Sequence, residues 1–335
     1  MAEYQPQNIL VTGGAGFIGC NYIRYMLTKY KNISIVNLDK LTYAGSLDNL
    51  ADLPDPSRHQ FIRGDICDQL MVAKLLRQYQ IDTIVHFAAE SHVDRSIAGP
   101  AAFIETNILG TFSLLEAARN YWLEDCQYGQ QQCRFHHIST DEVYGSLTET
   151  DPPFEESTRY APNSPYSASK ASSDHLVRAW HHTYGLPVTT SNCSNNYGPF
   201  QHSEKFIPTI IRCCLQRKPI PIYGDGSNIR DWLYVEDHCS GIDRVIRQGI
   251  TGETYNIGGH NELSNIDICH LICTLMDALL GRDSSSKDLI RFVDDRLGHD
   301  WRYAVGSGKM VAQLAWEPRE TLDTGIKKTI GWYYE

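Results

Sequence analysis

The 335-residue chain has no C-x-x-C pair, although it contains ten cysteines. No group of cysteines and histidines has the spacing of a zinc site, so the sequence predicts no metal centre. Cys269 and Cys273, four residues apart in a helical stretch, leave metal ligation open in principle, but small core side chains explain them better. We expect buried, reduced thiols and a cytoplasmic protein.

Long apolar runs are also missing. No stretch approaches the about 18 consecutive apolar residues that a membrane-spanning helix needs. The polar start MAEYQPQ does not resemble a signal peptide. The net charge of −10, with acids and bases interspersed, argues against nucleic acid or an acidic membrane as the main partner. An anionic small substrate would need locally placed Arg and Lys side chains.

Short apolar runs alternate with helical stretches through the first half of the chain. The runs expected to be strands span residues 8–13, 33–39, 61–65, 82–90, 134–140 and 187–193. This alternation is typical of βαβ units, so it predicts an α/β fold with a Rossmann-type, doubly wound parallel sheet. Beyond residue 195, loops rich in Pro and Gly precede expected helices at 264–280 and 322–334. These features predict a smaller, partly helical second domain.

Three glycines follow the first expected strand in VTGGAGFIG. Gly13, Gly16 and Gly19 are three residues apart, and their missing side chains allow a tight turn and a close approach of the backbone to a pyrophosphate. The second strand ends in Asp39, 20 residues after Gly19. A carboxylate there can bind an adenosine ribose and repel a 2′-phosphate. The pattern therefore predicts a dinucleotide cofactor, NAD rather than NADP.

Asp65 follows the third expected strand, in RGDIC. It has two interpretations: its loop meets the adenine of the cofactor, or its carboxylate caps the following helix.

The stretch SPYSASKAS places Tyr166 and Lys170 four residues apart, on one face of a helix that begins with Pro165. A nearby ammonium favours the phenolate, which lets a tyrosine take a hydroxyl proton during hydride transfer. The same spacing is common on solvated helix faces. The assignment therefore depends on the neighbouring motifs.

Two adjacent acids, Asp141 and Glu142, end the run HISTDEVYG. On a continuing strand their side chains would point to opposite faces, so both reach one pocket only if the strand ends near Thr140. Such a pair could supply a general acid and a general base to neighbouring atoms of a substrate. The alternative is a helix N-cap Asp with a solvated Glu beside it.

The spacings T-G-x-x-G-x-x-G and Y-x-x-x-K resemble those of the extended short-chain dehydrogenase/reductases. Nearly the whole chain resembles the dTDP-glucose 4,6-dehydratases among them, through LDKLTYAGSLDNL, AAESHVDRSI, STDEVYG, PYSASKASSDHLVRA, NCSNNYGP, YGDGSNIRDWLYVEDH and RLGHDWRYA. The resemblance implies a lyase that converts dTDP-glucose to dTDP-4-keto-6-deoxyglucose. It also implies a homodimer, with the helices near 103–121 and 166–184 of both subunits in a four-helix bundle.

The resemblance also implies the roles of the site residues. NAD takes hydride from carbon 4 of the sugar while Tyr166, supported by Thr140 and Lys170, takes the hydroxyl proton. Glu142 then removes the carbon 5 proton, Asp141 protonates the departing carbon 6 hydroxyl, and the hydride returns to carbon 6. Residues 1–195 would form the NAD-binding domain and carry these groups. Residues 196–335 would mainly bind the sugar nucleotide, with some chain returning to the first domain.

Further contacts follow from the same resemblance. The residues expected to bind the cofactor are Gly13, Gly16, Phe17, Ile18, Gly19, Asp39, Lys40, Leu41, Thr42, Asp65, Ile66, Phe87, Ala88, Ala89, Thr106, Tyr166, Lys170 and Asn196. Those expected to bind the substrate are Ser91, Thr140, Asn195, Lys205, Phe206, Pro221, Ile222, Tyr223, Arg230, Asn265, Asp295, Arg296 and His299. Arg230 and Arg296 suit a diphosphate because a guanidinium binds it bidentately. Either could instead belong to a surface ion pair.

Other functions remain open at this point. A UDP-sugar 4-epimerase of the same fold needs the Tyr base but has no use for the acidic pair. A UDP-glucose 4,6-dehydratase shares that pair and differs only in its substrate loops. In these substrate loops the chain differs from the sequence pattern usual in the family at two places. One is FQHSEKF, where an aromatic-Pro pair usually precedes Glu-Lys, and the other is Leu297, where Pro is usual. A non-catalytic NAD-sensing regulator would be expected to lack Tyr166, Lys170 or the carboxylates.

Overall fold

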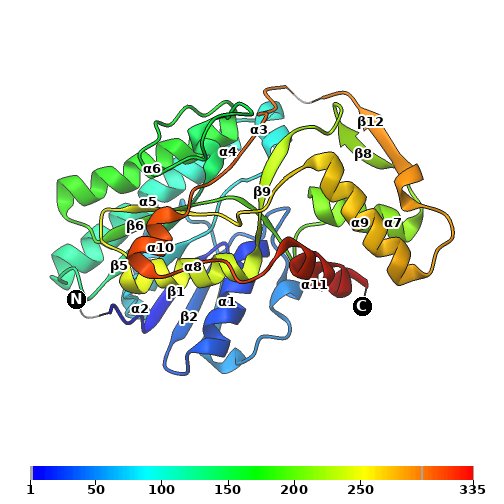
Figure 1. The fold of residues 1–335 in the computed structure, drawn as a ribbon. Coiled ribbons are helices and arrows are strands. Elements are labelled where there is room, and N and C mark those ends of the chain that lie inside the picture. Colours follow the sequence, from blue (N-terminus) through cyan, green and yellow to red (C-terminus); the bar gives the residue numbers. More distant parts are fainter. Residues whose placement is uncertain (1–2, 296, 335) are drawn as a thin grey trace.

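The computed structural model describes residues 3–295 and 297–334. Its main sheet has seven strands in the order β10-β6-β5-β4-β1-β2-β3, and each neighbouring pair is parallel. The strands are β1 (Asn8–Thr12), β2 (Ser34–Asp39), β3 (His59–Arg63), β4 (Thr83–His86), β5 (Arg134–Thr140), β6 (Val188–Cys193) and β10 (Thr254–Ile257). The predicted Rossmann-type sheet is confirmed (Figure 1).

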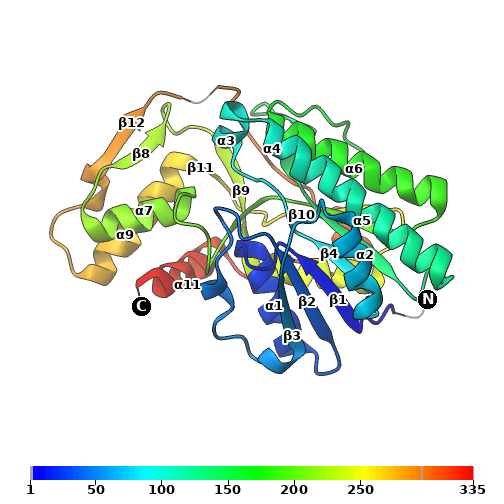
Figure 2. The same cartoon turned by 180° about the vertical axis from the view of Figure 1, so that it is seen from behind.

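Helices cover both faces of this sheet (Figure 2). Ile9 and Val11 of β1 pack into one core with helices α1, α8 and α10, whereas Leu10 between them packs into the other core with α2, α5 and α6. Strand side chains alternate between faces, so a strand buried on both sides needs this continuous apolar run. The helices are α1 (Phe17–Lys29), α2 (Gln69–Gln78), α5 (Gly110–Ala118), α6 (Pro165–Tyr184), α8 (Val235–Gln248) and α10 (Gly308–Leu314).

Most of the chain beyond residue 195 packs around a core of its own, the second core, on the right in Figure 1. A small sheet orders its strands β11-β9-β7, and β8 pairs with β12. The elements are β7 (Asn195–Tyr197), α7 (Phe206–Gln216), β8 (Ile220–Tyr223), β9 (Ile229–Tyr234), β11 (Glu262–Ser264), α9 (Asn265–Leu280), β12 (Ile290–Val293) and α11 (Leu322–Tyr334). The two helices predicted here from sequence, at 264–280 and 322–334, are confirmed as α9 and α11.

The chain beyond residue 195 also contributes to the main sheet and to the helices that cover it. Strand β10 adds to the edge of the main sheet beside β6, and α8 packs on α1. The division of the chain at residue 195 therefore stays a prediction, since one sheet takes strands from both sides of it.

The long helix predicted near 103–121 is a composite. After α3 (Val93–Ala98), the chain forms α4 (Ala101–Phe103), a π-helical segment (Ile104–Leu109), α5 and a second π-helical segment (Arg119–Asp125). A regular 3.6-residue repeat does not reveal such widened turns. Within the described residues, no helix is both long and apolar enough to cross a membrane.

Candidate functional site

Strand β5 ends at Thr140, and the chain turns at once into a short 3₁₀ helix, Asp141–Tyr144. The Thr140 hydroxyl accepts a hydrogen bond from the Glu142 amide at 3.3 Å and so caps this helix. The predicted strand end is confirmed, and the alternative that Asp141 is the cap is wrong. Because the strand stops here, Asp141 and Glu142 both line one cavity of about 320 Å³.

The two acids have different surroundings. Asp141 is 2% exposed, and burial, followed by the nearby Glu142 and Asp231 carboxylates, raises its pKa well above the usual range. Its Oδ2 has no hydrogen-bond partner among the residues that the structure describes. Glu142 is only partly buried. The raised pKa of Asp141 favours its protonated form, and a more solvated Glu142 beside it fits an acid and a base with separate roles.

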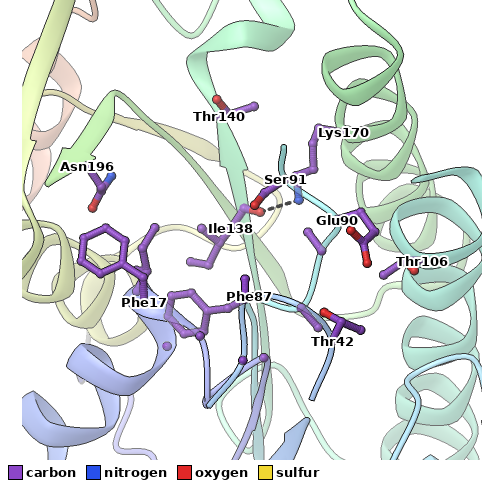
Figure 3. Close-up of a pocket in the computed structure, with 18 of the residues that line it drawn as sticks. Phe17, Thr42, Phe87, Glu90, Ser91, Thr106, Ile138, Thr140, Lys170 and Asn196 are labelled. Atoms are coloured by element: carbon purple, nitrogen blue, oxygen red, sulfur yellow. Dashed lines mark hydrogen bonds between the residues drawn. The ribbon is translucent and has the colours of Figure 1, made fainter. Parts of the chain in front are cut away.

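Helix α6 delivers Tyr166 and Lys170 to the same cavity. Ser164 and Ser167 form a capping box at its start, and Pro165 occupies its first position, which explains why the helix begins there. The Lys170 ammonium donates to the Ile138 carbonyl of β5 at 2.7 Å (Figure 3). Burial raises the pKa of Tyr166 well above its usual range, and a hydrogen bond with Thr140 opposes this shift.

The glycine turn also lines the cavity, through Gly13, Gly16 and Gly19. Gly13 has a φ of +73°, and an added Cβ would lie 2.6 Å from the Ala88 backbone nitrogen, so only glycine fits. Helix α1 follows Gly16 without a side-chain cap, which leaves its first N–H groups for an anion. This uncapped helix end beside a bare backbone fits the pyrophosphate of a dinucleotide.

Asp39 lies at the end of β2, as predicted, and lines the cavity. Its two oxygens accept from the backbone amides of Ala15 at 2.9 Å and Leu41 at 2.8 Å, which holds the carboxylate in place. Leu41 itself does not belong to the cavity lining.

Asp65 also lines the cavity, and its carboxylate lies 2.6 Å from the Lys40 ammonium. The alternative that Asp65 caps α2 is wrong: the cap is Asp68, which accepts from the Met71 amide at 3.0 Å.

Most predicted site residues meet at this one cavity. They are Gly13, Gly16, Phe17, Ile18, Gly19, Asp39, Lys40, Thr42, Asp65, Ile66, Phe87, Ala88, Ala89, Ser91, Thr106, Thr140, Asp141, Glu142, Tyr166, Lys170, Asn195, Asn196 and Lys205. Figure 3 shows Phe17 at the start of α1, Phe87 directly after β4 and Thr140 at the end of β5, all at this cavity.

Several predicted substrate residues lie beyond the lining: Phe206, Pro221, Ile222, Tyr223, Arg230, Asn265, Asp295 and His299. Arg296 lies outside the described residues. The Ile222 side chain is fully buried in the second core, so its contact with a ligand would come from its backbone. Arg230 donates to the carbonyls of Ile229 at 2.7 Å and Asp300 at 3.0 Å. The part of these residues in substrate binding stays a prediction.

The sequence reasoning missed other residues that line the cavity: Leu38, Ala44, Gly45, Gly64, Glu90, Ile138, Ser139, Cys193, Ser194, Gln201 and His202. Many follow or end a strand of the main sheet, and a search for every residue at that edge would have found them.

The sequence also shows no sign of the role of Asn107, which holds the backbone of the cavity-lining residue Glu90 in place. Its side chain bonds both backbone groups of Glu90, at 2.9 and 3.0 Å, and donates to the Ser169 hydroxyl at 2.8 Å.

Short-chain dehydrogenase/reductases combine a dinucleotide cradle with a Tyr-x-x-x-Lys helix, and here both stand at one edge of a Rossmann sheet, so the chain is an enzyme of that class. The model of the family described as GDP-mannose 4,6 dehydratase matches residues 10–329.

Known dehydratases narrow the assignment. The chain is 56% identical to dTDP-glucose 4,6-dehydratase 1 of Escherichia coli K12 and 54% identical to the dTDP-glucose 4,6-dehydratase of Salmonella typhimurium, each over 97% of this chain and 92% of the relative. A dTDP-glucose 4,6-dehydratase structure from Streptomyces venezuelae, with NAD and TYD bound, superposes with a TM-score of 0.88 at 45% identity, covering 98% of this chain and 97% of that one. The chain belongs to the dTDP-glucose 4,6-dehydratase family.

Proposed function

We propose that this protein is an NAD-dependent hydro-lyase that converts dTDP-glucose to dTDP-4-keto-6-deoxyglucose. The observation that supports it most is the placement of Asp141 and Glu142 at the end of β5, in one cavity with Tyr166 and Lys170. A 4-epimerase needs no acidic pair, and a regulator needs neither the pair nor the Tyr-Lys helix. The sequence identity to dTDP-glucose 4,6-dehydratases favours the dTDP sugar over the UDP sugar.

NAD, when bound, accepts a hydride from carbon 4 of the sugar and later returns it to carbon 6. Tyr166, hydrogen-bonded with Thr140 and one helical turn before Lys170, takes the proton of the carbon 4 hydroxyl. The resulting ketone acidifies the proton on carbon 5, which the Glu142 carboxylate removes. Asp141, whose pKa burial raises well above the usual range, gives its proton to the departing carbon 6 hydroxyl. When the hydride returns to carbon 6, Glu142 gives its proton back to carbon 5.

The cofactor end of the cavity supports NAD. The Gly13 turn and the uncapped start of α1 would hold the pyrophosphate, and Asp39 would accept from the ribose hydroxyls. The Lys40 charge, which would otherwise attract a 2′-phosphate, is paired with Asp65.

The proposed assembly is a homodimer through a four-helix bundle made from the 101–125 and 165–184 helices. Large apolar side chains on the first of these are exposed, with Ile104 at 47%, Leu109 at 53% and Phe112 at 39%. Several large exposed apolar side chains on one helix favour a contact with another protein surface.

We also propose a cytoplasmic location. All ten cysteines are free and eight of them are buried, which suits a reducing compartment.

The direct test is an assay of the purified protein with dTDP-glucose and no added NAD. We expect a 4-keto-6-deoxy product with retained cofactor, and slower conversion of UDP-glucose. A protein that epimerises carbon 4 without losing water, or that prefers UDP-glucose, would contradict the proposal.

A further inference from the structure

The inward face of α6 stays polar for two turns after Tyr166. Ser169, Lys170, Ser173 and Asp174 are all buried on this face, and the apolar core beside the main sheet is reached at Val177. A buried polar group destabilises the fold unless it is hydrogen-bonded, and a buried charge does so more strongly. Packing alone therefore does not explain why these polar side chains are buried on α6.

Asp174 is the carboxyl group of this face, and it is 6% exposed. Burial raises its pKa to about 6, and the nearby Lys170 charge is the largest influence that opposes this shift, so the carboxylate is ionised above that pH. Its Oδ2 accepts from the Ser139 hydroxyl at 2.8 Å and from the Tyr160 hydroxyl at 3.0 Å. Its Oδ1 lies 3.1 Å from Nε2 of His137. The carboxylate thus ties α6 to β5, the strand whose end carries Thr140 and the acidic pair.

Lys170 lies one helical turn before Asp174 and is 4% exposed. Burial lowers its pKa, and Asp174 is the largest influence that opposes this shift. The acids of the cavity, Asp141 and Glu142, raise the pKa of Tyr166 instead. The titratable groups that interact electrostatically with the Lys170 ammonium are His86 of β4, His137 of β5, Cys193 of β6 and Asp174 of α6.

The two histidines near Lys170 do not compete as counter-charges. His86 and His137 are fully buried, with ring centroids 5.3 Å apart. Burial lowers the pKa of each well below the usual range, so both stay neutral. Asp174 is therefore the group placed to balance a protonated Lys170 inside the protein.

We propose that Asp174 is a positioning residue that keeps Lys170 protonated and fixes α6 against β5, so that Tyr166 meets Thr140 at the cavity. The inference rests on the proposed function only for the role of Tyr166 and Lys170 in the oxidation at carbon 4. Asp174 does not line the cavity, and it acts through Lys170.

The test removes the charge with little change of shape. Asp174→Asn deletes the anion, and the matched control Tyr160→Phe deletes one hydrogen bond to the same carboxylate while the charge stays. We measure the pH profile of the single-turnover rate of carbon 4 oxidation. In Asp174→Asn we expect its alkaline limb to move to lower pH by about one unit or more, because a lysine without its counter-charge loses its proton at lower pH. Tyr160→Phe should keep the wild-type limb. An unmoved limb in Asp174→Asn, with a rate lowered equally at every pH, would overturn the proposal.

A second measurement needs no substrate. Acetic anhydride modifies only neutral amines, so the pH dependence of Lys170 acetylation, read by mass spectrometry with exposed Lys327 as the internal reference, reports the pKa of Lys170. Asp174→Asn, or the smaller Asp174→Ser if the first variant folds poorly, should shift half-maximal labelling to lower pH. Unshifted labelling would overturn the inference. Absent conversion of dTDP-glucose by the wild type would count against the proposed function alone.

Discussion

The Lys40 ammonium and the Asp65 carboxylate lie 2.6 Å apart at the rim of the cavity. Lys40 directly follows Asp39, and an unpaired ammonium there would soften the repulsion between Asp39 and a 2′-phosphate. The ion pair removes that complication, so the selectivity for NAD depends on two carboxylates rather than one.

This relationship predicts the effect of releasing Lys40. Asp65→Asn should strengthen NADP binding relative to NAD, because the released Lys40 ammonium can attract the 2′-phosphate. We expect a change of about tenfold in the affinity ratio, which corresponds to roughly 1.4 kcal/mol. Asp39→Asn should shift the ratio in the same direction. Titration of cofactor-free protein with both dinucleotides measures it. Asp52→Asn, which breaks the Arg24 ion pair away from the cavity, is the control. Equal affinities of the wild type for both cofactors would refute the explanation.

The start of α6 should couple stability to catalysis. Ser164→Ala removes the hydroxyl that accepts from the Ser167 amide at 3.1 Å, and loss of such a cap costs about 1 kcal/mol. Because Tyr166 lies in the first turn, kcat should fall as well. Asp68→Ala removes the cap of α2 and should lower the melting temperature similarly with kcat retained. Equal kcat values in the two variants would show that the first turn of α6 does not position Tyr166.

Buried histidine should make stability depend on pH. Burial lowers the pKa of His238 to about 3, and its Nδ1 lies 2.9 Å from Asn196 Oδ1. In the unfolded chain a histidine titrates near about 6.5. The folded-state pKa is the lower one, so this contribution to stability is complete above the unfolded pKa and is lost as pH falls.

Urea unfolding of His238→Gln at about pH 7.5 and about pH 5.5 tests this dependence. The variant should lose about 1 kcal/mol less stability than the wild type over that interval. His182→Gln, at an exposed position, should behave like the wild type. An identical pH dependence in His238→Gln and the wild type would mean that His238 is not kept neutral by the fold.

The proposed dimer depends on apolar side chains of the 101–125 helix. Leu109→Arg should give a monomer of 37.9 kDa in sedimentation at micromolar concentration, because a buried, unpaired guanidinium opposes association. Leu70, which is 85% exposed on α2, provides the control, and Leu70→Arg should stay dimeric. A monomeric wild type would contradict the bundle.

Local signals explain which parts could be predicted from sequence. The start of α6 was predictable because Ser164 and Pro165 act on their own helix. The end of β5 at Thr140 followed from the need to bring two adjacent carboxylates to one side. The Rossmann sheet followed from its apolar runs.

Other parts depend on contacts distant in sequence. Gln201 and His202 reach the cavity because their loop is held from elsewhere: the Tyr333 hydroxyl of α11 donates to the Gln201 carbonyl. Asn107 is buried because it lies in a π-helical segment, and a pattern based on 3.6 residues per turn does not predict which side chains of such a segment face inward. The positions of Arg230 and His299 relative to the cavity depend on how the second core packs, and no local motif encodes that packing.

In the proposed mechanism, Glu142 and Asp141 divide the elimination between them as base and acid. Each loss should lower turnover by on the order of a hundredfold or more. The two variants should nevertheless differ in one property, the exchange of the carbon 5 proton with solvent.

That exchange, measured by incorporation of deuterium from solvent into enzyme-bound sugar, is the most direct test. Asp141→Asn should keep it, because the ketone still forms and Glu142 still removes and returns the proton. Glu142→Gln should still oxidise carbon 4, seen as accumulated reduced cofactor, but should show no exchange. Persistent carbon 5 exchange in Glu142→Gln, or full turnover in either variant, would show that Glu142 and Asp141 do not act as this base and acid.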